Sequence, residues 1–139
     1  MRDRFQIIVV EDNRADLGLI KRSIHEAGID CDLVNFVDGA DAIAFINATA
    51  SPVADLILLD LNLPAVEGAS VLNSVRGSPR WSKAPVVIFT SSTAAADVAR
   101  ANNLGADSYI VKPAKLDEFV KIGDVIREWL GKRHASSRA

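Results

Sequence analysis

The chain has 139 residues, a length that suits one compact domain. Hydrophobic residues make up 49% of it and charged residues 24%, which is the composition of a globular protein and excludes a collagen-like or low-complexity chain. The formal net charge of −2 argues against a nucleic-acid-binding protein that relies on a strongly basic surface.

Five short apolar segments alternate with segments of helical spacing, which predicts a β/α alternation built on a parallel sheet. The predicted strands are residues 6–10, 33–37, 56–59, 86–89 and 108–111. The first, third and fourth are almost entirely apolar, as central strands covered by helices on both faces are. Asp32 and Asn35 make the second segment more polar, which favours an edge strand.

The first predicted helix begins after Asn13 and ends near residue 27. Four more are predicted over residues 40–48, 68–76, 94–103 and 116–130. The first has an apolar stripe that includes Leu17, Ile20 and Ile24 and stops at Gly28. The fourth is rich in alanine and has little to bury, which is consistent with a mobile element, although alanine is also simply a good helix former. Thr90 could cap this helix, and Ser92 or Thr93 would serve at least as well.

The last predicted helix carries an apolar stripe of Phe119, Ile122, Ile126 and Trp129. Because Val125 and Leu130 widen this stripe, it suits either core packing or a homodimer contact. After Gly131 the chain is basic, small and polar, so we expect a short flexible tail over residues 132–139.

Cysteine content and hydropathy indicate the compartment. The single cysteine, Cys31, cannot form an intrachain disulfide, and no signal sequence opens the chain, so we expect a cytoplasmic protein. The longest apolar runs, such as residues 56–59, are far shorter than the roughly 18 residues that a membrane span requires. We therefore expect no membrane partner.

Polar residues follow four of the predicted strands directly. They are Glu11 and Asp12 after the first strand, Asp60 after the third, Thr90 at the end of the fourth and Lys112 after the fifth. One acidic residue at such a position is usually a helix cap or a turn former. In an open α/β sheet, however, ligands bind outside the carboxyl ends of the strands, so neighbouring strands would bring these side chains together at one rim.

The three carboxylates at this rim would repel one another unless a raised pKa or a bound cation relieved the repulsion. Oxygen ligands of this kind suit Mg²⁺. Zinc is disfavoured, because Cys31, His25 and His134 lack the spacing of a zinc site. Lys112 suits contact with a phosphoryl oxygen, and a salt bridge to one of the carboxylates is the alternative.

These residues, in this order and spacing, resemble the CheY-like receiver domains of response regulators. The resemblance rests on the acidic pair Glu11-Asp12, on Asp60, on Thr90 and on Lys112-Pro113, and it covers residues 5 to about 130. It implies a flavodoxin-like, doubly wound five-stranded parallel sheet with strand order 2-1-3-4-5 and five helices. The receiver domain would span residues 1–131, ahead of the tail at 132–139.

The resemblance also implies a role for each residue of the rim. Asp60 would accept a phosphoryl group from a sensor histidine kinase. Asp12, Asp60 and the carbonyl of Asn62 would bind Mg²⁺, and Glu11 would act through water. Lys112 and Thr90 would contact the phosphoryl oxygens.

Phosphorylation would then move the hydroxyl of Thr90 and alter a surface that a protein partner binds. In the family, the threonine hydroxyl moves toward the phosphoryl group and a switch aromatic, here Tyr109, turns inward. The surface formed by residues 94–103, 108–111 and 116–130 would present the result. The chain resembles a stand-alone signalling protein, not an enzyme with turnover.

Short stretches suggest a narrower group within the family. Residues 10–17 and 59–64 and the terminal Glu128-Trp129-Leu130 are similar to stand-alone receivers paired with phytochrome-type sensor kinases; a generic sensor kinase is the alternative. Ser91 and Ala114 depart from the family, which commonly has alanine or glycine at the first of these positions and an aromatic residue at the second.

Three other functions are weighed against this one. A phosphatase of the haloacid-dehalogenase type needs a second carboxylate two residues after its nucleophile, where this chain has Asn62. A flavodoxin-like nucleotide-binding protein would need a glycine-rich loop after the first strand. A degenerate receiver that serves only as a binding scaffold is disfavoured by the complete set of rim residues.

Overall fold

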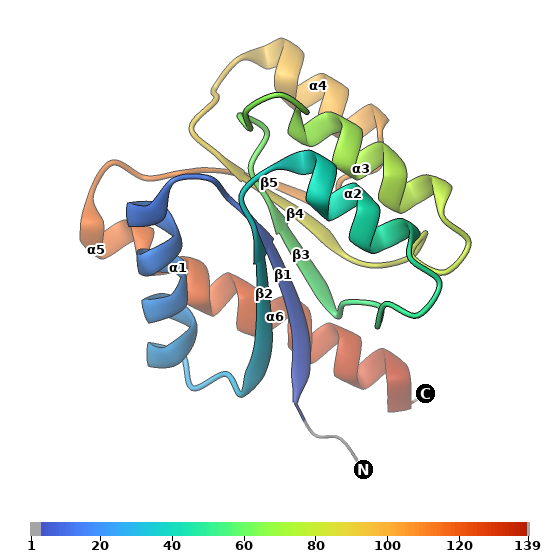
Figure 1. The fold of residues 1–139 in the computed structure, drawn as a ribbon. Helices are drawn as coiled ribbons and strands as arrows, with labels where there is room; N and C mark the ends of the chain where they lie inside the picture. The colour runs from blue at the N-terminus through green and yellow to red at the C-terminus, as the bar shows by residue number, and fades with distance from the viewer. Residues whose placement is uncertain (1–3, 139) are drawn as a thin grey trace.

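The computed structural model describes residues 4–138 of the chain, and the side chains of residues 4–132. A parallel five-stranded sheet forms its centre, in the order β2-β1-β3-β4-β5 (Figure 1). The strands are β1 (Phe5–Val10), β2 (Cys31–Phe36), β3 (Leu56–Leu59), β4 (Val86–Thr90) and β5 (Ser108–Val111). The predicted fold class and strand order are confirmed.

Burial along the strands follows the apolar pattern of the sequence. All residues of β3 and β4 are buried, whereas alternate residues of β2 reach solvent, as an edge strand allows. The edge position of this strand is confirmed, but its bounds shift toward the N-terminus, because Cys31 already pairs with Phe5.

Helices cover both faces of the sheet (Figure 1). They are α1 (Arg14–Glu26), α2 (Gly39–Asn47), α3 (Gly68–Gly77), α4 (Ala95–Asn103), α5 (Leu116–Phe119) and α6 (Ile122–Arg138). Side chains of α1, α5 and α6 share one core cluster with Ile7, Val9 and Phe89. Side chains of α2, α3 and α4 share the other with Ile8 and Val10.

The thin packing expected of α4 is confirmed, because Ala101 is its one buried residue.

Among residues 4–138, none of the helices combines the length and apolar character needed to cross a lipid bilayer.

The single helix predicted over residues 116–130 is wrong in two respects. It is divided, since α5 ends at Phe119 and α6 begins at Ile122. The apolar spacing hides this break, because Phe119, Ile122 and Ile126 are all buried in the same cluster. The two segments together occupy the place of the fifth helix of the fold.

The predicted helix end near Gly131 is also wrong, because α6 continues to Arg138. Glycine within a helix costs only about 1 kcal/mol relative to alanine, and good helix formers follow it. The backbone of residues 132–138 is therefore helical where a flexible tail was predicted. The side chain of His134 and all of Ala139 lie outside the described part of the chain.

Candidate functional site at the carboxyl end of the sheet

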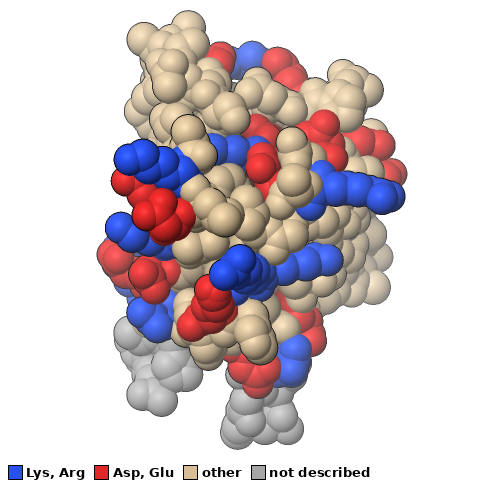
Figure 2. Space-filling model, turned by 90° about the vertical axis from the view of Figure 1, so that its left-hand side faces the viewer, with Lys and Arg blue, Asp and Glu red and all other residues tan. Residues whose placement is uncertain are grey.

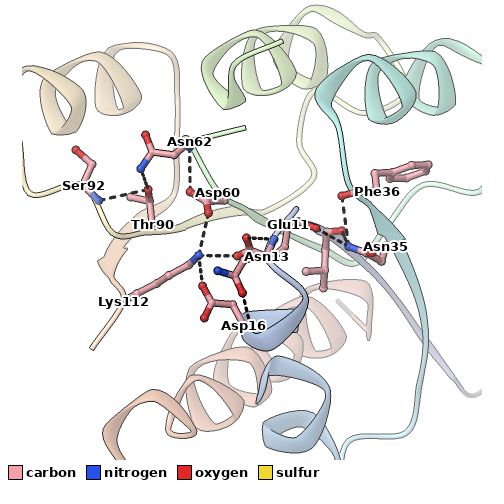
Figure 3. Close-up of polar contacts among 11 residues, drawn as sticks. Glu11, Asn13, Asp16, Asn35, Phe36, Asp60, Asn62, Thr90, Ser92 and Lys112 are labelled. Atoms are coloured by element: carbon pink, nitrogen blue, oxygen red, sulfur yellow. Dashed lines mark hydrogen bonds and ion pairs between the residues drawn. The ribbon is translucent and has the colours of Figure 1, made fainter. Parts of the chain in front are cut away.

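The register of β1 and β3 brings Glu11 and Asp60 together. Val10 pairs with Leu59, so the residues that follow them emerge side by side, and the Asp60 N–H donates to the Val10 carbonyl at 3.0 Å. The side chains of Glu11 and Asp60 are only 2% and 6% exposed. Figure 3 shows both carboxylates at the carboxyl end of the sheet.

Asp12 completes an acidic group with these two residues. Glu11, Asp12 and Asp60 each offer a carboxylate oxygen, and these oxygens all lie within 4.8 Å of one another. Asp12 is exposed, so the group opens to solvent on one side. An all-oxygen donor set of this size fits a hard divalent cation such as Mg²⁺, which keeps several waters and takes few protein ligands.

Lys112 lies at the centre of the charged side chains (Figure 3). Its Nζ is 2.7 Å from Glu11 Oε1, 2.7 Å from Asp16 Oδ2 and 2.9 Å from Asp60 Oδ2, and its side chain is 7% exposed. A lysine ammonium has three N–H donors, so each can be matched by one carboxylate. The salt bridge considered from the sequence is therefore present, with three partners.

Burial and charge shift the pKa values in this group. Burial raises the pKa of Glu11 to about 7, and the nearby charge of Asp60 adds to this, while the hydrogen bond from Lys112 opposes it. Burial by itself would lower the pKa of Lys112, but its hydrogen bonds to Asp16, Asp60 and Glu11 prevail and raise it. Lys112 is thus firmly charged, and a bound cation would compete with a proton at Glu11.

Asp16 is a member of this group that sequence reasoning missed. It lies in the first turn of α1, where Asn13 caps the helix by accepting the Asp16 N–H at 3.0 Å. Asp12 precedes the N-cap of α1, so the spacing of Asp12 and Asp16 is not that of two helix residues and gave no signal for this contact.

Asn35 is a second contributor that sequence reasoning interpreted only as an edge-strand feature. Its Nδ2 donates to the carbonyls of Val9 at 2.9 Å, Glu11 at 3.3 Å and Phe36 at 3.3 Å. The side chain therefore joins the ends of β1 and β2 and fixes the backbone at Glu11 (Figure 3).

Asn62 and Thr90 lie on the other side of Asp60 (Figure 3). The Asn62 N–H donates to Asp60 Oδ1 at 3.0 Å, and Asn62 Nδ2 donates to Thr90 Oγ1 at 3.3 Å. Thr90 is fully buried, and its hydroxyl also accepts the Ser92 N–H at 3.4 Å. The predicted rim residues of β3 and β4 are thus linked to each other by hydrogen bonds.

The loop that carries Asn62 is held close to Asp60 by Gly68. A Cβ atom at Gly68 would lie 2.3 Å from the Asp60 carbonyl oxygen, so only glycine fits. Within the same loop Ala65 has φ of 61°, a left-handed conformation that is unusual for a residue with a side chain.

Ser92 connects the rim to Tyr109 on β5. The half-buried Tyr109 donates its hydroxyl to the Ser92 carbonyl at 2.9 Å. The Ser92 hydroxyl donates to Asp97 at 2.5 Å and accepts the Ala94 N–H at 3.3 Å. The prediction that Ser92 or Thr93 caps α4 is therefore wrong, because the N-cap is Ala94 and no side chain caps it.

The two positions that depart from the family lie beside this site. Ser91 and Ala114 are exposed and line a surface hollow together with Asp16, Lys112 and Leu116. Leu116 is 54% exposed, so the hollow has an apolar margin next to the charged group.

Surface charge on the side seen in Figure 2 is mixed. Lysine and arginine side chains alternate there with aspartate and glutamate, and no large area has a single sign. This mixture of signs agrees with the net charge of −2.

Comparison with known proteins agrees with this geometry. The family model described as the response regulator receiver domain matches residues 7–123. The chain is 35% identical over 129 residues to the response regulator Rcp1 of Synechocystis, covering 89% of this chain and 88% of that protein.

Two solved structures have a similar fold. One is the phosphorylated cyanobacterial phytochrome response regulator RcpA, with a TM-score of 0.86, 32% identity, and coverage of 94% of this chain and 96% of that one. The other is the Mn²⁺-bound form of Rcp1, with a TM-score of 0.84, 34% identity, and coverage of 91% and 94%.

Proposed function

Because the chain belongs to the family of response regulator receiver domains, we propose that it is a signalling protein whose Asp60 accepts a phosphoryl group from a sensor histidine kinase. The observation that carries this proposal is the environment of Asp60. Its buried carboxylate lies within an oxygen-donor group, and its Oδ2 is 2.9 Å from the ammonium of Lys112.

The transfer itself needs positioning and charge neutralisation more than a base. A carboxylate oxygen of Asp60 attacks the phosphorus, and an O–P bond forms. The P–N bond of the phosphohistidine breaks, and its electron pair returns to the ring nitrogen of the kinase. The Asn62 N–H on Asp60 Oδ1 and the Lys112 Nζ on Oδ2 fix the orientation of the attacking carboxylate.

Asp12, Asp60 and the main-chain carbonyl of Asn62 would hold a Mg²⁺ ion, with Glu11 acting through water. The closeness of the carboxylate oxygens supports this set, and the related Rcp1 has a Mn²⁺-bound form. When bound, the cation supplies positive charge against the anionic carboxylates and phosphoryl group.

Lys112 and Thr90 are the proposed contacts of the phosphoryl oxygens. Once the Thr90 hydroxyl turns toward the phosphoryl group, the Ser92 N–H loses its acceptor. The loop that begins α4 is then free to shift, and Tyr109 loses its partner at the Ser92 carbonyl. The surface of α4, β5 and the α5–α6 segment would present this change to a protein partner.

The cognate kinase is proposed to be of the phytochrome type, because Rcp1 and RcpA are similar over most of this chain. We place the receiver domain at residues 1–131 and the protein in the cytoplasm. A homodimer through α6 is also proposed. The half-buried Trp129 supports it, since this residue packs only at the margin of the core.

Labelling with radioactive acetyl phosphate tests the proposed function. We expect Mg²⁺-dependent label on the wild-type chain, no label after chelation by EDTA and none on Asp60→Asn. Asp41→Asn, an exposed acidic residue in the first turn of α2, is the matched control and should label normally. Label that persists on Asp60→Asn or in EDTA would contradict the proposal. Absence of label on the wild-type chain would favour a receiver that serves only as a binding scaffold. Multiple turnovers of a phosphate monoester would favour a phosphatase.

A further inference from the structure

Asp16 is the outermost of the three carboxylates that bind Lys112. Its side chain is 23% exposed, against 2% for Glu11 and 6% for Asp60. Its distance to the Lys112 Nζ, 2.7 Å, is nevertheless as short as that of Glu11. The ammonium is therefore in direct contact with a carboxylate on the solvent side of the rim as well as on the inside.

The position of Asp16 is built into the start of α1. Asn13 accepts the Asp16 N–H through its side chain, and the Asn13 N–H donates in turn to Glu11 Oε2 at 3.1 Å. Figure 3 shows that the Asp16 carboxylate points from this first turn toward Lys112. The helix start therefore connects Asp16 to Glu11, and Lys112 bridges the two carboxylates.

A phosphoryl group on Asp60 changes what Lys112 must bind. The three N–H donors of Lys112 already have carboxylate partners, so one of them must be released before the ammonium can contact a phosphoryl oxygen. Glu11 and Asp60 belong to the oxygen group that suits a divalent cation, whereas Asp16 does not. Asp16 is thus the carboxylate that keeps competing for Lys112.

We infer that Asp16 is a positioning residue that restrains Lys112 at the outer rim and so slows phosphorylation of Asp60. This inference rests on the proposed function and deepens it. Asp16 touches neither phosphorus nor the attacking oxygen, and it acts only through Lys112. Its negative charge also opposes the approach of an anionic phosphodonor, so both effects have the same direction.

The step that Asp16 slows is phosphoryl transfer to Asp60, for example from acetyl phosphate. The Asp60 oxygen forms a bond to phosphorus, the bond from phosphorus to the acetyl oxygen breaks, and acetate leaves with the electron pair. Lys112 keeps its proton throughout. One of its N–H groups changes its acceptor from the Asp16 carboxylate to a phosphoryl oxygen.

The test compares the labelling rate by acetyl phosphate in the wild type, Asp16→Asn, Asp16→Glu and Asp41→Asn. Asparagine keeps the size of Asp16 but removes its charge, so the rate should rise about three- to tenfold. Glutamate retains the ion pair and should restore the wild-type rate. Asp41→Asn makes the same change of net charge away from Lys112 and should leave the rate unchanged.

A second readout needs neither metal nor phosphodonor. In the metal-free protein, the ammonium NMR signal of Lys112 should be protected from solvent exchange in the wild type and in Asp16→Glu. The signal should exchange faster in Asp16→Asn.

The outcomes separate the two proposals. The role of Asp16 would be overturned, with the proposed function left standing, if the wild type were labelled as fast as Asp16→Asn. A faster rate in Asp41→Asn or Asp16→Glu would overturn it as well. So would an ammonium signal of Lys112 that exchanges at the same rate in the wild type and in Asp16→Asn. A wild type that takes no label would instead overturn the proposed function.

Discussion

Two neighbouring parts of the rim are held by different forces. The charged half consists of Glu11, Asp16, Asp60 and Lys112. The hydrogen-bonded half consists of Asn62, Thr90, Ser92 and Tyr109. Ion pairs of 2.7 to 2.9 Å hold the charged half, whereas the hydroxyl of Thr90 accepts hydrogen bonds of 3.3 and 3.4 Å.

The difference indicates which half is rigid and which can rearrange. A buried charge that loses its partner is costly, so the charged half keeps its geometry until another charge replaces one of its members. A neutral hydrogen bond contributes only about 0.5–1.5 kcal/mol, so the hydrogen-bonded half can change partners easily. Under the proposed function, the charged half would hold the attacking carboxylate in place, and the hydrogen-bonded half would rearrange in response.

The largest effect should come from removing the cation of the charged half. Lys112→Ala leaves buried carboxylates without a partner, so the metal-free protein should lose about 3 kcal/mol of its free energy of unfolding. Urea unfolding in EDTA measures this loss. The exposed Lys83→Ala is the control and should change stability by less than about 0.5 kcal/mol. Equal losses in the two variants would contradict the comparison.

A smaller effect should appear as a pH dependence that comes from Glu11. Its pKa is about 7 in the folded protein against an ordinary value of 4.5, so the folded state binds the proton more tightly. The stability contribution of Glu11 is therefore complete below pH 4.5 and is lost as the pH rises through 7.

Unfolding of the metal-free wild type and Glu11→Gln across this pH range checks the prediction. The wild type should lose stability relative to Glu11→Gln as the pH rises, and Mg²⁺ should reduce the difference. A difference in the free energy of unfolding that stays constant with pH would show that burial in the charged half does not raise the pKa of Glu11.

The smallest effects should come from the hydrogen-bonded half. Thr90→Val keeps the shape of the buried side chain and removes its hydroxyl, and Tyr109→Phe removes the hydrogen bond to Ser92. Each should lower the free energy of unfolding by only about 1 kcal/mol. A loss as large as that of Lys112→Ala would mean that both halves are equally rigid.

The parallel sheet and the principal rim residues could be predicted from the sequence because they follow simple rules. Strand ends of a parallel sheet share one edge, so the polar residues after strands had to meet there. Asp16 could not be placed in the same way, since its contact depends on how α1 docks and turns its first residues toward Lys112. The pairing of a helix side chain with a residue 96 positions away is set by tertiary packing.

The divided helix near the C-terminus was hidden for a related reason. Phe119 and Ile122 keep a helical spacing across the break, because both side chains bury against the same face of the sheet. Beyond it, a close approach fixes α6 on α1, since a Cβ atom at Gly123 would lie 2.3 Å from the Ser23 carbonyl oxygen. Neither feature alters the apolar pattern from which the helix was predicted.

Chemical mapping of the phosphorylated residue shows directly whether Asp60 is the phosphoacceptor. The chain is treated with acetyl phosphate and Mg²⁺ and then with borohydride, which reduces an aspartyl phosphate to homoserine, and peptide mass spectrometry locates the product. We predict homoserine at position 60 and nowhere else, and none in EDTA. Homoserine at position 12 or 16, or an unmodified Asp60 beside a phosphorylated chain, would contradict this prediction.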